Sequence, residues 1–122
     1  PFALERLSFN GKVKYAIISP DGKNVIYTNE INGKQSLWLR QLGSGNNSEI
    51  ISPTDDTYYG LAISPDGNFV YFVRRSNTFE GQGDIYRISI FGGIPQKIIN
   101  QTQGWISLSS DGAKISFVRC FY

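Results

Sequence analysis

The sequence contains no histidine and no methionine, and its single cysteine is Cys120. Without histidine, the Ser-His-Asp and Cys-His arrangements that activate catalytic nucleophiles cannot form within this chain. One cysteine cannot make an internal disulfide, so it does not settle the redox compartment, and we expect it to be a small strand residue. We therefore expect these 122 residues to hold no catalytic site and no cofactor.

Long apolar runs and basic clusters are missing as well. No segment approaches the roughly 18 apolar residues that a membrane span needs, and no signal peptide is recognisable. The net charge is only +2, and Arg74-Arg75 is an isolated basic pair, so no basic stripe is present to displace counterions from phosphates. We expect neither nucleic acid nor a membrane as a partner. Because the chain starts at Pro1 and stops just after a strand-like run, we interpret it as a piece of a longer protein.

What the sequence does contain is a repeat. Ser-Pro-Asp-Gly occurs at 19–22 and 64–67, a variant without Pro occurs at 109–112, and the three aspartates are 45 positions apart. Such a period indicates units that stack on copies of themselves. In these turns Pro presets φ, Asp accepts hydrogen bonds from the turn backbone and Gly takes the left-handed conformation. We therefore interpret the motif residues as structural: Pro20, Asp21, Gly22, Pro65, Asp66, Gly67, Asp111 and Gly112.

Each unit is predicted to contain four short strands. The first unit has strand-like segments at 15–19, 25–28, 36–42 and 48–52, and the second has them at 61–63, 69–73, 84–90 and 96–99. The third unit has only 105–108 and 114–118, and Phe2–Ser8 resembles a lone outer strand. The expected loops are Asn29–Gln35, Thr54–Tyr59, Arg75–Gly83 and Gln101–Trp105.

Several strands are apolar on both faces. In the segment 70–73, for example, Val70 and Phe72 on one face alternate with Tyr71 and Val73 on the other. A sheet with one solvent-exposed face would instead alternate apolar with polar residues. Both faces are therefore expected to be covered, as in β-propeller blades, and the fixed period favours this fold over a sandwich. We predict an all-β, partial β-propeller of about two and a half four-stranded antiparallel blades. Its units are an N-terminal strand at 1–14 and blades at 15–59, 60–104 and 105–122.

The repeat resembles the TolB-like, WD40-like β-propeller repeat. Ile18 to Tyr27 with Leu37-Trp38, and Ile63 to Phe72 with Ile85-Tyr86, match its pattern of a Ser-Pro-Asp-Gly turn followed by an aromatic strand. The third copy departs from the pattern because Ser110 replaces Pro. The strands are also similar to propeller regions of bacterial, acidobacterial-type signalling proteins, in which the propeller lies outside the membrane.

This resemblance implies a non-enzymatic module for protein–protein interaction or ligand sensing, in a periplasmic or other extracytoplasmic location. The alternative is the non-catalytic propeller of a larger enzyme, such as a prolyl-oligopeptidase-like peptidase. Propellers need four or more blades. We therefore expect either self-association or the remainder of a longer chain to complete the ring.

A partner surface is expected at one end of the strands. The Asp-Gly turns share one end, and the longer loops share the other, where aromatic and arginine side chains of the kind that interfaces favour are concentrated. The candidates are Tyr58, Tyr59, Arg74, Arg75, Phe79 and Trp105. The competing interpretation is that Tyr58, Tyr59 and Trp105 pack between blades.

No metal site is expected. The three turn aspartates should not converge, because blades separate equivalent turns. Asp55-Asp56 is a better candidate for calcium, although a solvated loop is the simpler interpretation of this pair.

Overall fold

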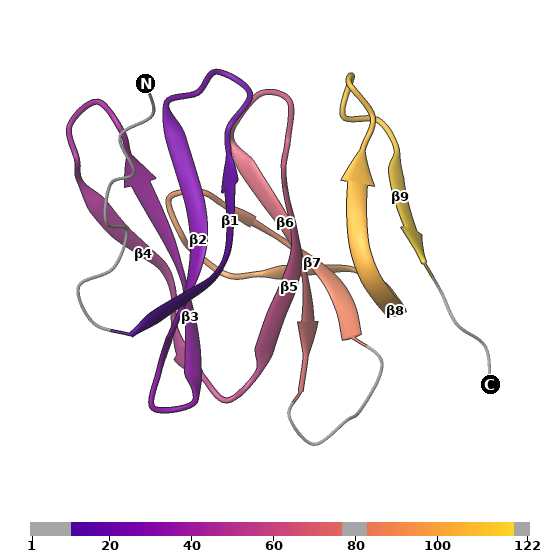
Figure 1. Ribbon diagram of the computed structural model, residues 1–122. Coiled ribbons are helices and arrows are strands. Elements are labelled where there is room, and N and C mark those ends of the chain that lie inside the picture. The colour runs from indigo at the N-terminus through magenta and orange to yellow at the C-terminus, as the bar shows by residue number, and fades with distance from the viewer. Residues whose placement is uncertain (1–10, 77–82, 119–122) are drawn as a thin grey trace.

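A computed structural model describes residues 11–76 and 83–118, without the side chains at 101–105 and 117–118 (Figure 1). In these ranges the chain forms nine strands and no helix, so the predicted all-β class is confirmed. Phe2–Ser8, Phe79 and Cys120 lie outside the described residues. The strands are β1 (Lys12–Ile18), β2 (Asn24–Ile31), β3 (Lys34–Gln41), β4 (Asn47–Thr54), β5 (Thr57–Ile63), β6 (Phe69–Arg75), β7 (Gly83–Ser89), β8 (Gln96–Leu108) and β9 (Ile115–Val118).

The strands form consecutive antiparallel meanders. The first sheet has the order β1-β2-β3-β4 and the second has the order β5-β6-β7-β8-β9. Strand β8 is long because its first part pairs with β7 and its second part pairs with β9. In Figure 1 the first sheet lies beside the second, and the β8–β9 hairpin lies on the side of the second sheet that is opposite the first. Two four-stranded units and the start of a third are therefore present, as the repeat predicts.

The three Asp-Gly turns are built alike. In the first, the Asp21 carboxylate accepts hydrogen bonds from Ser19 Oγ (2.6 Å) and Lys23 N (2.9 Å), and Asn24 N donates to Ser19 Oγ (3.0 Å). The turns at 64–67 and 109–112 repeat these three bonds at 2.5 to 3.0 Å. Each aspartate thus accepts hydrogen bonds within its own turn, which supports the structural role predicted for it.

Burial on both faces of the second sheet explains its sequence. Val70 and Phe72 of β6 join a core with Ile26 and Leu37 of the first sheet, while Val73 joins a second core with Ile106 of the third unit. The side chains of Val70, Phe72, Ile26 and Leu37 are all fully buried. A single four-stranded unit could not remove both of its apolar faces from water, so the burial of these faces depends on the units stacked beside it.

Two of the four predicted loops are shorter than expected. The segment Asn29–Gln35 is mostly strand, because β2 and β3 are joined by Asn32-Gly33 alone. Both residues have positive φ (54° and 77°), as a two-residue type I′ hairpin requires. Thr54–Tyr59 is also mostly strand, since only Asp55 and Asp56 separate β4 from β5.

A third predicted loop is absent. Gln101–Trp105 is part of β8, which continues from the second unit into the third without a break. The change of sheet between the first two units falls between Thr54 and Thr57, earlier than the predicted boundary after Tyr59. The division into units of 15–59, 60–104 and 105–122 is otherwise left as a prediction.

Candidate interaction surface

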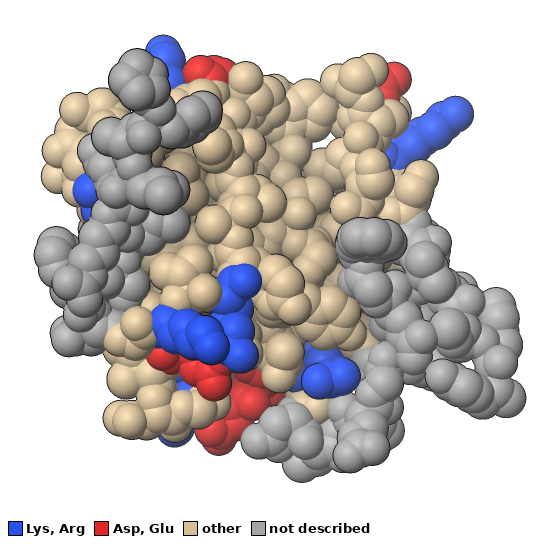
Figure 2. All heavy atoms as spheres, in the orientation of Figure 1, with Lys and Arg blue, Asp and Glu red and all other residues tan. Residues whose placement is uncertain are grey.

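The two ends of the sheets carry different connections. We call the end with the β2–β3 hairpin, the β4–β5 link and the β6–β7 connection the loop face, and the end with the Asp-Gly turns the turn face (Figure 1). Figure 2 shows charged side chains near both ends of the visible surface, with a broad uncharged area between them. On the loop face acidic and basic side chains lie next to each other, so this end presents no field of a single sign.

Tyr58 does not lie on the surface, and its predicted exposure is wrong. Its side chain is fully buried, and its ring meets Phe72 edge to face at 5.5 Å. Its hydroxyl lies 3.1 Å from Thr54 Oγ1, and its backbone N–H donates to Gln35 Oε1 at 3.0 Å. Burial raises the pKa of the Tyr58 hydroxyl. Tyr58 therefore links β3 and β4 of the first sheet to the second sheet, in agreement with the competing interpretation.

Arg74 is also engaged within the protein. Its Nε lies 2.6 Å from Asp56 Oδ2, and its guanidinium carbon lies 5.7 Å from the ring centroids of Tyr58 and Tyr86. The Asp56 carboxylate is thereby used in an ion pair. Within the two described ranges, no three His, Cys, Asp or Glu side chains are grouped as a metal ion would require. The geometry gives Asp56 a structural role in joining the β4–β5 link to β6.

Tyr59 and Arg75 face the opposite side of the second sheet, because side chains alternate along a strand. The guanidinium carbon of Arg75 lies 5.8 Å from the Tyr59 ring centroid, and both residues are partly exposed. Burial raises the pKa of the Tyr59 hydroxyl, Arg75 opposes this shift, and nearby Tyr15 adds to it. Tyr15 of β1 is 48% exposed. We call Tyr15, Tyr59 and Arg75 the aromatic–arginine cluster.

Tyr15 was not among the candidates from the sequence. The sequence placed it in the strand-like segment 15–19, yet β1 shifts register between Val13 and Ala16, and such bulges redirect the side chains they carry. Strands β5 and β8 shift register at the same place in the repeat. Aligning the units at their period of 45 would have marked this position, which is occupied by Tyr15, Gly60 and Trp105.

The remaining candidates cannot be placed on the surface. Phe79 lies outside the described residues, and for Trp105 only the main chain in β8 is described. Their predicted role in partner binding therefore stays a prediction, as does that of Tyr59, Arg74 and Arg75.

Stacked four-stranded antiparallel sheets, each hydrogen-bonded within itself and joined to the next by an apolar core, define the chain as part of a β-propeller. No protein-family model matches the sequence. The chain is 26% identical over 103 residues to a protein TolB homolog from Chlorobium chlorochromatii (strain CaD3), covering 83% of this chain and 22% of that protein.

Solved structures agree with this likeness. A putative TolB from Agrobacterium tumefaciens superposes with a TM-score of 0.74 at 26% identity, covering 90% of this chain and 39% of that one. TolB from Acinetobacter baumannii gives a TM-score of 0.60 at 24% identity, covering 84% and 25%, which supports the fold alone. The chain spans less than two-fifths of each of these relatives. By sequence and by structure, the chain is similar to part of these TolB proteins.

Proposed function

We propose that the chain is a non-enzymatic protein-interaction module of a TolB-like propeller that works in the periplasm. The likeness to TolB homologues in both sequence and structure supports this function and location. No helix in the described ranges is long and apolar enough to cross a membrane. The alternative, a propeller attached to a larger enzyme, would also leave this segment without catalytic residues.

The observation that carries the proposal is the aromatic–arginine cluster. Tyrosine and arginine dominate the binding energy of many protein interfaces, because they combine a large apolar area with directional polar groups. Here Tyr59 and Arg75 lie in paired strands, with Thr57 opposite Arg75 and Val73 opposite Tyr59. A partner would meet side chains that the sheet already holds in place, which lowers the entropic cost of binding.

Site-specific photocrosslinking tests this surface. A photoreactive phenylalanine analogue replaces Tyr15 in cells of the source organism, and the same analogue at Phe91, which is 74% exposed on the turn face, serves as the matched control. We expect one defined protein to be crosslinked from position 15 and lost when Arg75→Glu is added. Crosslinking from position 91 alone would contradict the proposed surface.

The location is tested separately. Osmotic shock should release the protein, or a longer protein that contains it, with the periplasmic fraction. Recovery with the cytoplasmic fraction would exclude the proposed compartment while leaving the interaction surface open to the crosslinking test.

A further inference from the structure

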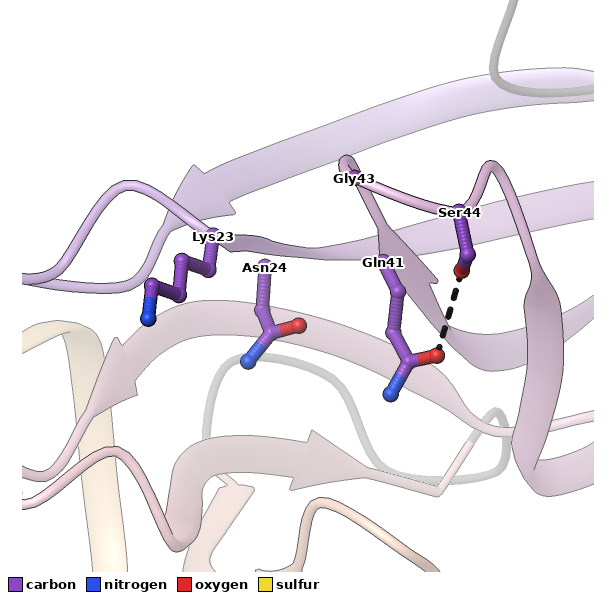
Figure 3. A pocket seen from close by; sticks show the side chains of 5 residues that line it. All are labelled: Lys23, Asn24, Gln41, Gly43 and Ser44. Atoms are coloured by element: carbon purple, nitrogen blue, oxygen red, sulfur yellow. Dashed lines mark hydrogen bonds between the residues drawn. The ribbon is translucent and has the colours of Figure 1, made fainter.

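An open hollow of about 460 Å³ lies on the turn face of the first sheet. It is lined by residues from the start of β2, the end of β3 and the turns beside them: Lys23, Asn24, Gln41, Gly43 and Ser44. Figure 3 shows the nitrogen-bearing ends of Lys23, Asn24 and Gln41 pointing in one direction. The volume falls within the range of small-molecule sites.

The backbone around the hollow is already hydrogen-bonded. Gln41 N donates to Asn46 O (2.9 Å), Leu42 N to Lys23 O (2.9 Å) and Gly45 N to Gln41 O (2.8 Å). A bound molecule would therefore be recognised by side chains, and not by the addition of a strand to a free edge. This arrangement disfavours an extended peptide, which usually binds through main-chain hydrogen bonds.

The side chains supply a set of donors. Ser44 Oγ donates to Gln41 Oε1 at 3.4 Å, which leaves the Gln41 Nε2 donor facing the hollow (Figure 3). Asn24 pairs directly with Gln41 across β2 and β3, so the two amides are neighbours. The Lys23 ammonium forms no ion pair within the described part of the chain. The nearby Asp21 carboxylate accepts from Ser19 Oγ and Lys23 N.

The second sheet shows that the fold does not require these polar residues. Phe69 and Ser89 occupy the paired positions of Asn24 and Gln41. The surrounding backbone bonds are nevertheless kept: Ile90 N donates to Asn68 O (3.0 Å), as Leu42 N does to Lys23 O. Because one scaffold accepts either pair, the amides of the first sheet are free to serve a ligand.

We propose that this hollow binds an acidic saccharide, with sugar oxygens accepting from the amides of Asn24 and Gln41 and a carboxylate accepting from Lys23. A sugar presents several acceptor oxygens close together, which suits two adjacent amide donors. A carboxylate would add a charge-assisted hydrogen bond from the lysine. The aliphatic part of Lys23 and the flat surface at Gly43 can contact the C–H groups of the ring.

Titration calorimetry with trigalacturonate tests the site on the intact chain. The double variant Asn24→Phe, Gln41→Ser copies the second sheet, so it should fold, and we expect it to weaken binding about tenfold or more. Lys23→Gln should weaken binding of the acidic sugar several-fold. Lys34→Gln removes a similar charge beside the β2–β3 hairpin on the loop face and should change the affinity less than about twofold.

Three further probes decide the ligand class: maltotriose, inorganic phosphate and an acetylated acidic tripeptide. Tight binding of trigalacturonate alone supports the proposal. Equal binding of maltotriose would overturn the role of Lys23, and equal binding of phosphate or of the tripeptide would overturn the saccharide. Absence of binding by all four, with a folded protein confirmed by circular dichroism, would also overturn it. None of these outcomes bears on the crosslinking test of the aromatic–arginine cluster.

Discussion

The first and second sheets share one scaffold but differ in their connections. In the first sheet Thr28 pairs with Leu37, nine positions on, whereas in the second Val73 pairs with Ile85, twelve positions on. Between these equivalent pairs the second sheet therefore has three more residues than the first.

The opposite change follows further along the chain. Two residues separate β4 from β5, whereas the equivalent strands of the second and third units are fused into β8. The two changes cancel, so the turn aspartates keep their spacing of 45 although the sheets differ. A constant period thus shows that strands and turns are equivalent, but it does not show that the loops are. Variation at the loop face is tolerated because the cores lie between the sheets.

The largest effect is expected at Phe72, on which the contact between the two sheets depends. It is fully buried, meets Tyr58 edge to face and stacks on Tyr86 at 5.8 Å. Phe72→Ala should lower the free energy of unfolding by about 3–5 kcal/mol, measured by chemical denaturation. Ile94→Ala on the turn face, where the side chain is 92% exposed, provides the comparison and should change stability by less than about 0.5 kcal/mol. Similar losses from both variants would contradict the stacked arrangement.

A smaller effect is expected where the two sheets need different residues at one position. Gly83 of β7 corresponds to Gln35 of β3, since they pair with Thr102 and Thr54 in the same register. A Cβ at Gly83 would lie 2.8 Å from both Arg74 O and Val73 Cγ1. Gly83→Ala should therefore destabilise the protein by about 1–3 kcal/mol in thermal or denaturant unfolding.

The matched change in the first sheet is Gln35→Ala. It removes the acceptor for Tyr58 N but introduces no overlap, so we expect a loss of about 1 kcal/mol. If Gly83→Ala were neutral, the close approach of β6 and β7 at this point would be wrong.

The sequence predicted the turns and most strands because their signals are local. Ser-Pro-Asp-Gly specifies its own hydrogen bonds, and the apolar residues on both faces of β6 indicate that both faces are covered. The hairpin at Asn32-Gly33 was read as part of a longer loop because the adjacent strand residues Asn29 and Glu30 are polar. That reading placed too much weight on polarity, since Asn-Gly is itself a strong hairpin signal.

The site was less predictable, because it depends on how sheets stack. The sequence cannot show that Tyr58 is directed into the core shared with the first sheet and Tyr59 toward the second core, since a shift of one residue in register exchanges the two faces. It also gave no signal for the hollow beside Asn24 and Gln41, which are 17 positions apart and meet only through the pairing of β2 with β3.

The third turn offers a smaller test of equivalence. Ser110 stands where the other turns have Pro20 and Pro65, yet the hydrogen bonds of Ser109 and Asp111 are the same as in those turns. Ser110→Pro should raise the free energy of unfolding by about 0.4–1 kcal/mol, because it restricts the unfolded chain without changing the turn. Pro20→Ser should have the opposite effect of similar size. A loss of stability in Ser110→Pro would show that the third turn differs in its backbone.

The smallest effect is expected on the stability of the fold at acidic pH. Measuring it tests whether the three turns are also electrostatically equivalent. The hydrogen bond from the preceding serine, and then the bond from the backbone N–H two residues on, lower the pKa of Asp21, Asp66 and Asp111 below 3.8. A carboxyl whose pKa is lower in the folded state stabilises the fold fully above the unfolded value and loses this contribution as pH falls through the folded value. Stability from the turns should therefore be constant above about pH 5 and decline below about pH 4. Denaturant midpoints measured between pH 6 and pH 2 should show this decline reduced to a similar extent in each single Asp→Asn variant, with Asp55→Asn, outside the turns, as the control. A much larger change in one turn than in the other two would show that the repeat is equivalent in geometry but not in charge.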